Sequence, residues 1–253
     1  NGKDQRQYRE FYRYLEEESI NYCVVSTVSD IDFSLANLKI ICSDPKTIII
    51  LKLHCIVRLK KCSIIYRSRG LSPEESYFKN KNYLKYIVLS AIELFAVASA
   101  DSILFVSEKH REYVRNKYRA EKNGAIIHNY NLNFQYHGKN NNLPVDYNIC
   151  YAGSLSKWQN TDIVLDLFSR LYQYNKNLRF YFFTDDIAGM SKNLIKKYNF
   201  VKFSNPDESQ LEENLNKMDF GVIVRENLSL NLVSSPFKII DYLTAGLRVI
   251  STD

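Results

Sequence analysis

The chain has 253 residues, of which 45% are apolar and 25% charged, a composition typical of a soluble globular protein with one or two domains. The net charge of +6 is uneven, since residues 1–145 carry about +7 and residues 146–253 about −1. Length and composition therefore exclude a fibrous or strongly acidic chain and direct attention to the basic first half.

Six basic residues and no acid lie between Lys52 and Arg69. They form either a solvated basic face or a surface that meets anionic lipid headgroups or a lipid-linked phosphate. No recognised nucleic-acid-binding motif accompanies this charge, so we expect no nucleic-acid partner.

The cysteines and histidines indicate no metal site. Four scattered histidines lack HxxxH spacing, and no CxxC pair is present. The odd number of cysteines, four of them in or beside apolar runs, predicts buried free thiols in a reducing compartment, hence a cytoplasmic protein. The five are Cys23, Cys42, Cys55, Cys62 and Cys150.

Membrane and export signals are weak. The polar opening Asn1–Arg13 predicts no signal peptide. The most apolar helical stretch, Tyr83–Ser99, contains Lys85 and Glu93 and is short for a membrane span. We expect a soluble protein or one peripheral to the membrane.

In the first half, strands and helices alternate. Asp44-Pro45 is a good helix start, with Asp as N-cap and Pro at the first helical position, although Ile48-Ile49-Ile50 has strand composition. In chain order we predict a helix Arg6–Glu18, strands Tyr22–Ser26 and Leu38–Cys42, a helix from Pro45 to Lys61, strand Ser63–Tyr66, helix Tyr83–Ser99, strand Ile103–Val106, helix Glu108–Tyr118 and strand Ala125–His128.

Asn129–Asp146, with three consecutive asparagines, reads as a linker. The second half then has strands Asn148–Ala152, Phe180–Thr184, Val201–Phe203, Phe220–Val224 and Arg248–Ser251, with helices Thr161–Tyr174, Ser191–Tyr198, Asp207–Met218 and Pro236–Thr244, and a loop Arg225–Ser235. Apolar strands alternating with amphipathic helices predict an α/β protein with two Rossmann-like domains, 1–140 and 146–253, each with a parallel sheet. A cleft is expected between the carboxyl ends of their strands.

The helix that starts near Ser235 is the strongest candidate binding site. Ser235 can act as N-cap and Pro236 suits the first turn, which leaves N–H groups and a positive dipole end for a phosphate. Lys238 opposes that dipole unless an anion binds; otherwise it is an exposed lysine on an ordinary helix. Asp241 lies on the same face and either accepts ribose hydroxyls or pairs with Lys238.

Two strand ends supply further candidates. Arg225 follows an apolar strand and can meet phosphate oxygens with its guanidinium, while Glu226 and Asn231 can bind sugar hydroxyls. After another strand, Gly153 permits close backbone approach in the turn that continues through Ser154, and Lys157 can neutralise phosphate. Trp158, the single tryptophan, can line the cleft.

These segments together resemble a known family. Gly-Ser-Leu at 153–155 with Lys-Trp-Gln at 157–159, then Arg-Glu-Asn at 225–227, Asn231 and Ser-Pro-x-Lys-x-x-Asp-Tyr-Leu at 235–243, resemble the donor-binding domain of GT-B glycosyltransferases of family 4. The stretches 100–108 and 125–129 and the Arg-Gly…Pro-Glu-Glu pattern at 69–75 resemble the first domain of that family.

The resemblance implies retaining, metal-independent sugar transfer from a nucleotide-diphosphate sugar, with no cofactor, to a glycan or lipid-linked glycan acceptor in surface polysaccharide synthesis. By that likeness Lys238, Arg225 and Lys157 stabilise the departing diphosphate, with Glu226 beside them in the catalytic set. The other donor-binding residues implied are Gly153, Ser154, Asn231, Ser235, Pro236 and Asp241. Arg69 and Glu74 would lie across the cleft, near donor phosphate or acceptor.

Three departures from the family pattern stand out. The family commonly has glutamate in place of Asp241, a second glutamate at the position of Val233, and arginine at that of Ser154. Glu226 or Asn231 would have to substitute for the glutamate missing at Val233. The chain also looks incomplete at both ends, without a first strand or a closing helix. A non-catalytic nucleotide-sugar-binding subunit and a GT-B nucleotide-sugar epimerase therefore remain alternatives.

Overall fold

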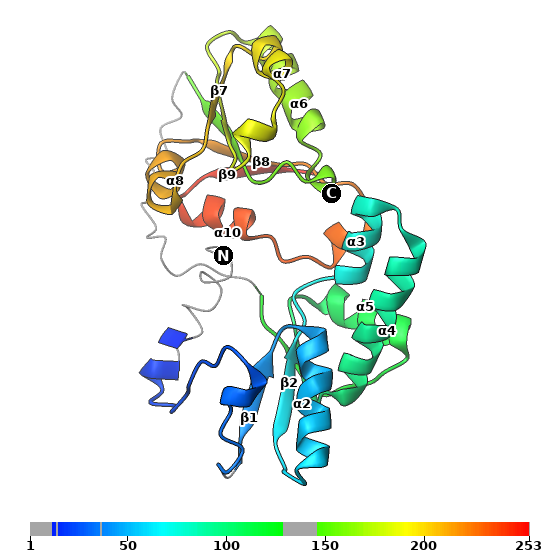
Figure 1. Ribbon diagram of the computed structural model, residues 1–253. Helices are drawn as coiled ribbons and strands as arrows, with labels where there is room; N and C mark the ends of the chain where they lie inside the picture. Colours follow the sequence, from blue (N-terminus) through cyan, green and yellow to red (C-terminus); the bar gives the residue numbers. More distant parts are fainter. Residues whose placement is uncertain (1–11, 14, 36, 129–145, 253) are drawn as a thin grey trace. The chain divides into compact units, whose positions relative to one another are not determined.

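The computed structural model describes residues 12–13, 15–35, 37–128 and 146–252 (Figure 1). The chain forms two compact units, Asn1–Asn129 with Leu232–Ser235 and Tyr130–Asn231 with Pro236–Asp253. The second unit therefore gives four residues near its carboxyl end to the first. The expected linker lies outside the described residues except for Asp146.

The first unit contains a four-stranded parallel sheet in the order β1-β2-β3-β4. Its strands are β1 (Lys39–Cys42), β2 (Ser63–Arg67), β3 (Ser102–Phe105) and β4 (Gly124–Ile126). Its helices are α2 (Pro45–Val57), α3 (Ser72–Asn80), α4 (Tyr83–Ser99) and α5 (Glu108–Tyr118), with a 3-10 turn η1 (Val28–Asp30). Part of the expected first helix is described, and residues 12–13 and 15–17 are helical.

Local side-chain caps determine where three of these helices begin. Asp44, Asn82 and Ser107 each accept a hydrogen bond from the backbone N–H three residues later, at 2.8, 2.9 and 3.0 Å. Such caps satisfy a backbone donor that the helix itself leaves without a partner. The starts of α2, α4 and α5 are therefore encoded within a few residues of sequence.

The second unit contains a five-stranded parallel sheet in the order β7-β6-β5-β8-β9. Its strands are β5 (Asn148–Ala152), β6 (Arg179–Phe183), β7 (Val201–Ser204), β8 (Phe220–Ile223) and β9 (Arg248–Ser251). Its helices are α6 (Thr161–Tyr174), α7 (Lys192–Lys197), α8 (Glu208–Leu215), α9 (Ser229–Leu232) and α10 (Phe237–Thr244), with 3-10 turns η2 (Lys157–Gln159) and η3 (Ile187–Gly189).

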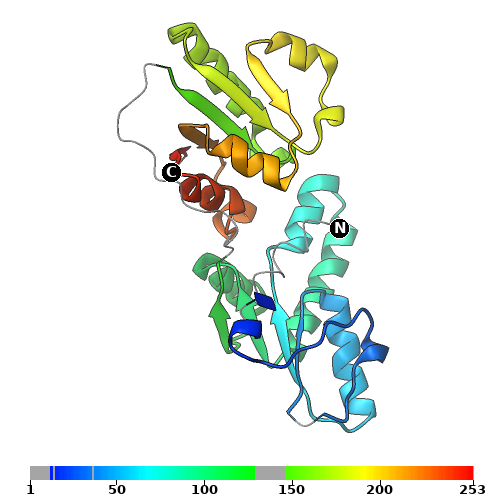
Figure 2. The same ribbon diagram turned by 90° about the vertical axis from the view of Figure 1, so that its left-hand side faces the viewer.

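Helices cover both faces of this second sheet (Figure 2). Along β5, Ile149 and Tyr151 belong to the buried cluster that contains α6, whereas Cys150 and Ala152 belong to the cluster that contains residues of α8 and α10. Because successive side chains of a strand point to opposite faces, this alternation is what two helical layers require. The predicted α/β class with parallel sheets is confirmed.

Helix α10 packs closely on β8 and β5 through Tyr242. Its ring is fully buried against Gly221, where a Cβ would overlap the ring, and its hydroxyl accepts a hydrogen bond from the Ala152 N–H at 2.7 Å. Glycine is therefore needed at position 221 for the close approach of the helix. These contacts hold the second half of α10 against the two strands.

Several sequence-based expectations about local structure were wrong. Tyr22–Ser26 is irregular and exposed rather than a strand, because no neighbouring strand buries its apolar side chains. Helices α3 and α9 were not predicted, although Pro73 near the start of α3, followed by two glutamates, is a typical helix-start signal. Helix α10 begins one residue later than expected, with Pro236 rather than Ser235 at the N-cap.

The cysteine prediction also needs correction. Cys55, in α2, and Cys62, just before β2, form a disulfide that joins residues seven apart, and Cys23 is exposed. The expectation of buried free thiols therefore fails for these three residues. Odd cysteine number and apolar surroundings do not reveal which pairs come close in space. With that premise lost, the argument for a reducing compartment is lost too.

Candidate functional site

The order of strands in the second sheet marks a position for a ligand. From β5 the chain builds outward through β6 and β7, and it then returns to the other side of β5 as β8 and β9. In an open α/β sheet, ligands bind outside the carboxyl ends of the strands where the order reverses. Here the residues that follow those ends are Gly153, after β5, and Arg225, shortly after β8.

Lys238, at the second position of α10, reaches this point. Its Nζ donates a hydrogen bond to Gln159 Oε1 at 2.8 Å and lies 4.2 Å from the centre of the Tyr151 ring. A Cβ on Gly153 would come within 2.6 Å of the same nitrogen. The lysine ammonium therefore contacts the glycine turn, and the absence of a side chain at position 153 makes room for it.

Arg225 adds a second cation. Burial, together with the nearby charge of Arg225, lowers the pKa of Lys238 to about 7. Burial also lowers the pKa of Arg225 itself. Burial of both groups and the Arg225 charge near Lys238 disfavour the protonated forms, and an anion bound at this point would raise both pKa values.

The loop that carries Arg225 is tied to its surroundings at both ends. The Arg225 N–H donates to Thr252 Oγ1 at 2.9 Å, and that hydroxyl donates to the Arg225 carbonyl at 2.8 Å. Farther on, the buried Asn231 side chain donates from Nδ2 to the carbonyls of Glu226 at 3.0 Å and Trp158 at 3.4 Å. Asn231 thus joins the loop after β8 to the turn after β5.

The other expected donor-binding residues of the second unit occupy different environments. Lys157 and Glu226 are exposed, and Ser154 is half-buried, with its hydroxyl donating to Ser156 Oγ at 3.0 Å. Asp241 is buried, with 6% of its surface exposed, inside α10. Lys238, Arg225 and Gly153 are therefore the predicted residues that come together.

Ser235 and Val233 belong by contacts to the first unit. Val233 is buried, and its carbonyl accepts a hydrogen bond from Ser107 Oγ at 2.7 Å. The position where the resembling family has a glutamate is thus a packed apolar residue in this chain.

The two acceptor-side candidates also lie in the first unit. Arg69 is exposed, in the loop between β2 and α3. Glu74, in the first turn of α3, uses one oxygen to accept hydrogen bonds from Lys117 Nζ at 2.5 Å, Tyr113 at 3.0 Å and Tyr86 at 3.4 Å. Its carboxylate is thus bound to α4 and α5 within its own unit.

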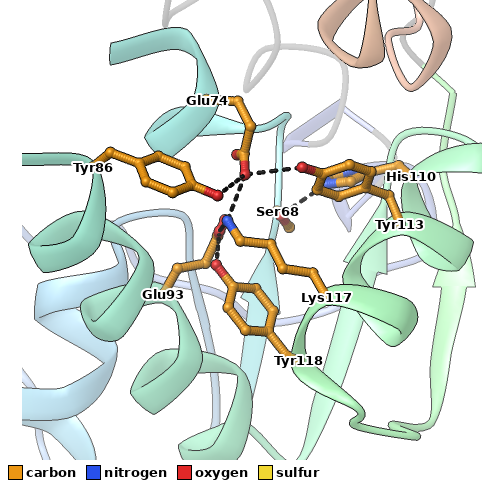
Figure 3. Close-up of polar contacts among 8 residues, drawn as sticks. All are labelled: Ser68, Glu74, Tyr86, Glu93, His110, Tyr113, Lys117 and Tyr118. Carbon is orange, nitrogen blue, oxygen red and sulfur yellow. Dashed lines mark hydrogen bonds and ion pairs between the residues drawn. The ribbon is translucent and has the colours of Figure 1, made fainter. Parts of the chain in front are cut away.

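Sequence reasoning did not find the rest of this cluster. Figure 3 shows Lys117 between two carboxylates, because its Nζ is also 3.7 Å from Glu93 Oε2. Tyr118 donates to the same Glu93 oxygen at 2.5 Å. Burial raises the pKa of Glu93, although Tyr118 and Lys117 counteract it. A glutamate inside the apolar run Tyr83–Ser99 was the one available signal.

Ser68 and His110 form a second pair beside this cluster (Figure 3). His110 is fully buried, and its Nε2 is 3.3 Å from Ser68 Oγ. Burial lowers its pKa to about 4, so the ring is neutral at pH 7. Ser68 directly precedes Arg69, so the pair supports the start of the loop that carries this arginine.

Within the described residues, no group of three metal-binding side chains is present. A search of the same residues also finds no helix that is long and apolar enough to cross a membrane.

No family model matches the sequence, and no curated protein matches it either. Solved structures do match. WaaG, a glycosyltransferase involved in lipopolysaccharide biosynthesis, is 14% identical with a TM-score of 0.58, over 79% of this chain and 62% of that chain. Sucrose-phosphate synthase from Thermosynechococcus elongatus is also 14% identical, with a TM-score of 0.62 over 84% and 55% of the two chains.

A third match is the trehalose-6-phosphate synthase from E. coli bound with UDP-2-fluoro glucose, 11% identical with a TM-score of 0.59, over 86% and 59% of the two chains. The fold is that of the GT-B glycosyltransferases. At this level of identity the likeness concerns the GT-B fold alone. The chain spans less than two thirds of each of these three proteins.

Proposed function

We propose that this chain carries the donor-binding site of a nucleotide-sugar-dependent glycosyltransferase. The observation that supports this most is the meeting of Lys238 and Arg225 at the strand-order reversal of the second sheet. Both cations come from elements that begin or end at the same edge, where α/β sheets bind ligands. A diphosphate would neutralise their mutual repulsion and return their pKa values toward the ordinary range.

In this proposal the diphosphate of the donor contacts Lys238, Arg225 and the backbone at Gly153, with Lys157 and Glu226 at the exposed margin. As the sugar leaves, negative charge grows on the diphosphate, and the fixed cations stabilise that charge. Asp241 would hold the ribose, and Ser154, Asn231, Ser235 and Pro236 would line the donor site. The transfer would be retaining and would need no metal.

For the acceptor we propose a glycan or lipid-linked glycan of surface polysaccharide synthesis, met through Arg69, which is exposed, and the helix of Glu74. The enzyme would then act in the cytoplasm at the inner face of the membrane. The basic stretch Lys52–Arg69 supports this, since four apolar side chains of the same region are exposed: Leu53, Ile56, Val57 and Leu59.

The membrane part of the proposal is tested by sedimentation with vesicles. Anionic vesicles should retain the protein and zwitterionic vesicles should not, and a double charge reversal at Lys60 and Lys61 should reduce retention. Equal sedimentation with both kinds of vesicle would contradict an electrostatic contribution.

One observation favours a second candidate, a non-catalytic nucleotide-sugar-binding subunit. Val233 stands where the resembling family has a glutamate, and it is buried. A donor site that keeps its cations but lacks this carboxylate could bind a nucleotide sugar without transferring the sugar.

Calorimetry against UDP, GDP and their common sugars, beside a hydrolysis assay on the same panel, tests both candidates. Binding with turnover supports the transferase. Binding without turnover supports the subunit. No binding of any nucleotide would contradict both candidates.

A further inference from the structure

The side chain of Lys238 is held at its tip by two contacts. Lysine side chains have four rotatable bonds, and fixing one costs up to about 2 kcal/mol of conformational entropy. Here the ammonium is hydrogen-bonded to Gln159 at 2.8 Å and packs on the Tyr151 ring at 4.2 Å. Both contacts are made by the tip of the chain, so they select one position for the charge.

Gln159 is suited to hold that position. Lysine has no acceptor atom, so the amide oxygen of Gln159 must face it. The residue ends the 3-10 turn η2, where its N–H donates to the Ser156 carbonyl at 2.8 Å, and α6 begins two residues later. The amide therefore projects from a short turn that is anchored between β5 and α6.

Tyr151 forms the other side of this holder. Its ring is fully buried and stacks on Phe182 with the ring centres 4.6 Å apart, and its hydroxyl donates to the Ser154 carbonyl at 2.9 Å. The ring is thus fixed by packing on one side and by the glycine turn on the other. A cation over such a ring is attracted to its face.

We propose that Gln159 is a positioning residue, which holds the Lys238 ammonium against the Gly153 turn before a nucleotide diphosphate arrives. This inference rests on the proposed function. The amide and the ring occupy part of the ammonium's surroundings, and the remaining N–H donors stay available to a phosphate oxygen. A ligand would then find the cation already in position, which reduces the entropy that binding must otherwise remove.

The charges around Lys238 predict how the affinity for a diphosphate depends on pH. Arg225 faces the ammonium and disfavours its protonated form, while Tyr151, which itself lies near Arg225 and Asp185, is neutral because burial raises its pKa. The Gln159 oxygen favours the protonated form, since it accepts a hydrogen bond from it. Affinity for a diphosphate should therefore fall as the pH rises above about 7, the pKa of Lys238 in the unliganded protein.

The test measures the affinity of UDP and GDP by calorimetry between pH 6 and pH 9. At pH 7, Gln159→Leu should weaken binding about 3- to 10-fold and should move the pH at which affinity declines to lower values. Gln159→Glu, which keeps an acceptor and adds a charge, should move this pH upward. Gln173→Leu, an exposed glutamine on α6, is the matched control and should change neither quantity.

A second measurement follows the Lys238 titration without any ligand, by NMR of lysine labelled at Cε. The contact between Gln159 and Lys238 is supported if the midpoint of the Lys238 titration is lower than wild type in Gln159→Leu and higher in Gln159→Glu. If wild type binds UDP or GDP but Gln159→Leu has unchanged affinity and an unchanged midpoint, the positioning role is overturned and the proposed function stands. If wild type binds neither nucleotide, the proposed function fails, and the positioning role fails with it.

Discussion

Lys117 in the first unit and Lys238 in the second are both largely withdrawn from water, yet opposite groups surround them. Lys117 lies between the carboxylates of Glu74 and Glu93. Lys238 contacts a neutral amide and an aromatic ring and faces another cation, Arg225. The first lysine has its counter-charge inside the protein, so its role is structural. In the proposed function, the second receives its counter-charge from a bound diphosphate.

The largest effect that this comparison predicts is on stability. Lys117→Met should lower the free energy of unfolding by about 3–5 kcal/mol at pH 7, because it leaves the buried Glu93 and the half-buried Glu74 without their cation. Denaturant unfolding measures this. Lys109→Met removes an exposed ion pair on the same helix, with Glu112, and should cost no more than about 1 kcal/mol. Equal losses for both variants would show that the Lys117 cluster is not a structural unit.

The next effect is on binding. Lys238→Ala should weaken the binding of UDP or GDP by about 1.5–3 kcal/mol, roughly a 10- to 150-fold rise in Kd, because a charge-assisted hydrogen bond to the diphosphate is lost. Calorimetry measures this change. Lys202→Ala, an exposed lysine of β7, is the control and should bind like wild type. An unchanged Kd for the Lys238 variant would remove the basis of the proposed donor site.

A smaller effect is expected at the glycine turn. Gly153→Ala should weaken nucleotide binding about 5-fold, or roughly 1 kcal/mol, since the new Cβ displaces the Lys238 ammonium that lies 2.6 Å from it. Gly70 has almost the same backbone φ, 157° against 158°, but no atom lies within 4 Å of its added Cβ. Gly70→Ala is therefore the control. Backbone strain should cost both variants similar stability, but only Gly153→Ala should also displace Lys238.

The smallest effect concerns the pH dependence of folding. Burial raises the pKa of Glu93 above its unfolded value of about 4.3. The folded state therefore holds this proton more tightly, and the stability it contributes is present at low pH and lost as the pH rises through the folded pKa. Glu93→Gln keeps an acceptor for Tyr118 without a charge, so its unfolding free energy should decline less than that of wild type between pH 4.5 and pH 8. Parallel curves would contradict a raised pKa.

Sequence patterns predicted most of the fold because helix caps and apolar periodicity act over short distances. The predicted ranges Tyr83–Ser99, Thr161–Tyr174 and Arg248–Ser251 agree with α4, α6 and β9. The strand predicted at Tyr22–Ser26 failed because strand formation depends on a neighbouring strand, which composition does not report.

The site was predictable only in part, for a related reason. The position of Lys238 near a helix start indicated a phosphate ligand, but its contact with Gln159 joins residues 79 apart in the sequence. The bond between Glu74 and Lys117 likewise spans 43 residues, so the contact by which this glutamate joins α3 to α5 was not predicted. Pairs of this kind have no periodicity that one sequence can reveal.

Ser107 has a consequence for any attempt to divide the chain. Its hydroxyl accepts the N–H of His110, in the first turn of α5, and also donates to the carbonyl of Val233, which comes 126 residues later. Val233, the buried residue of the peptide from Leu232 to Ser235, thus belongs by its contacts to the amino-terminal half. A fragment that starts at residue 146 would contain Val233 without the residues that bury it. Such a carboxyl-terminal fragment should therefore expose an apolar segment just before α10.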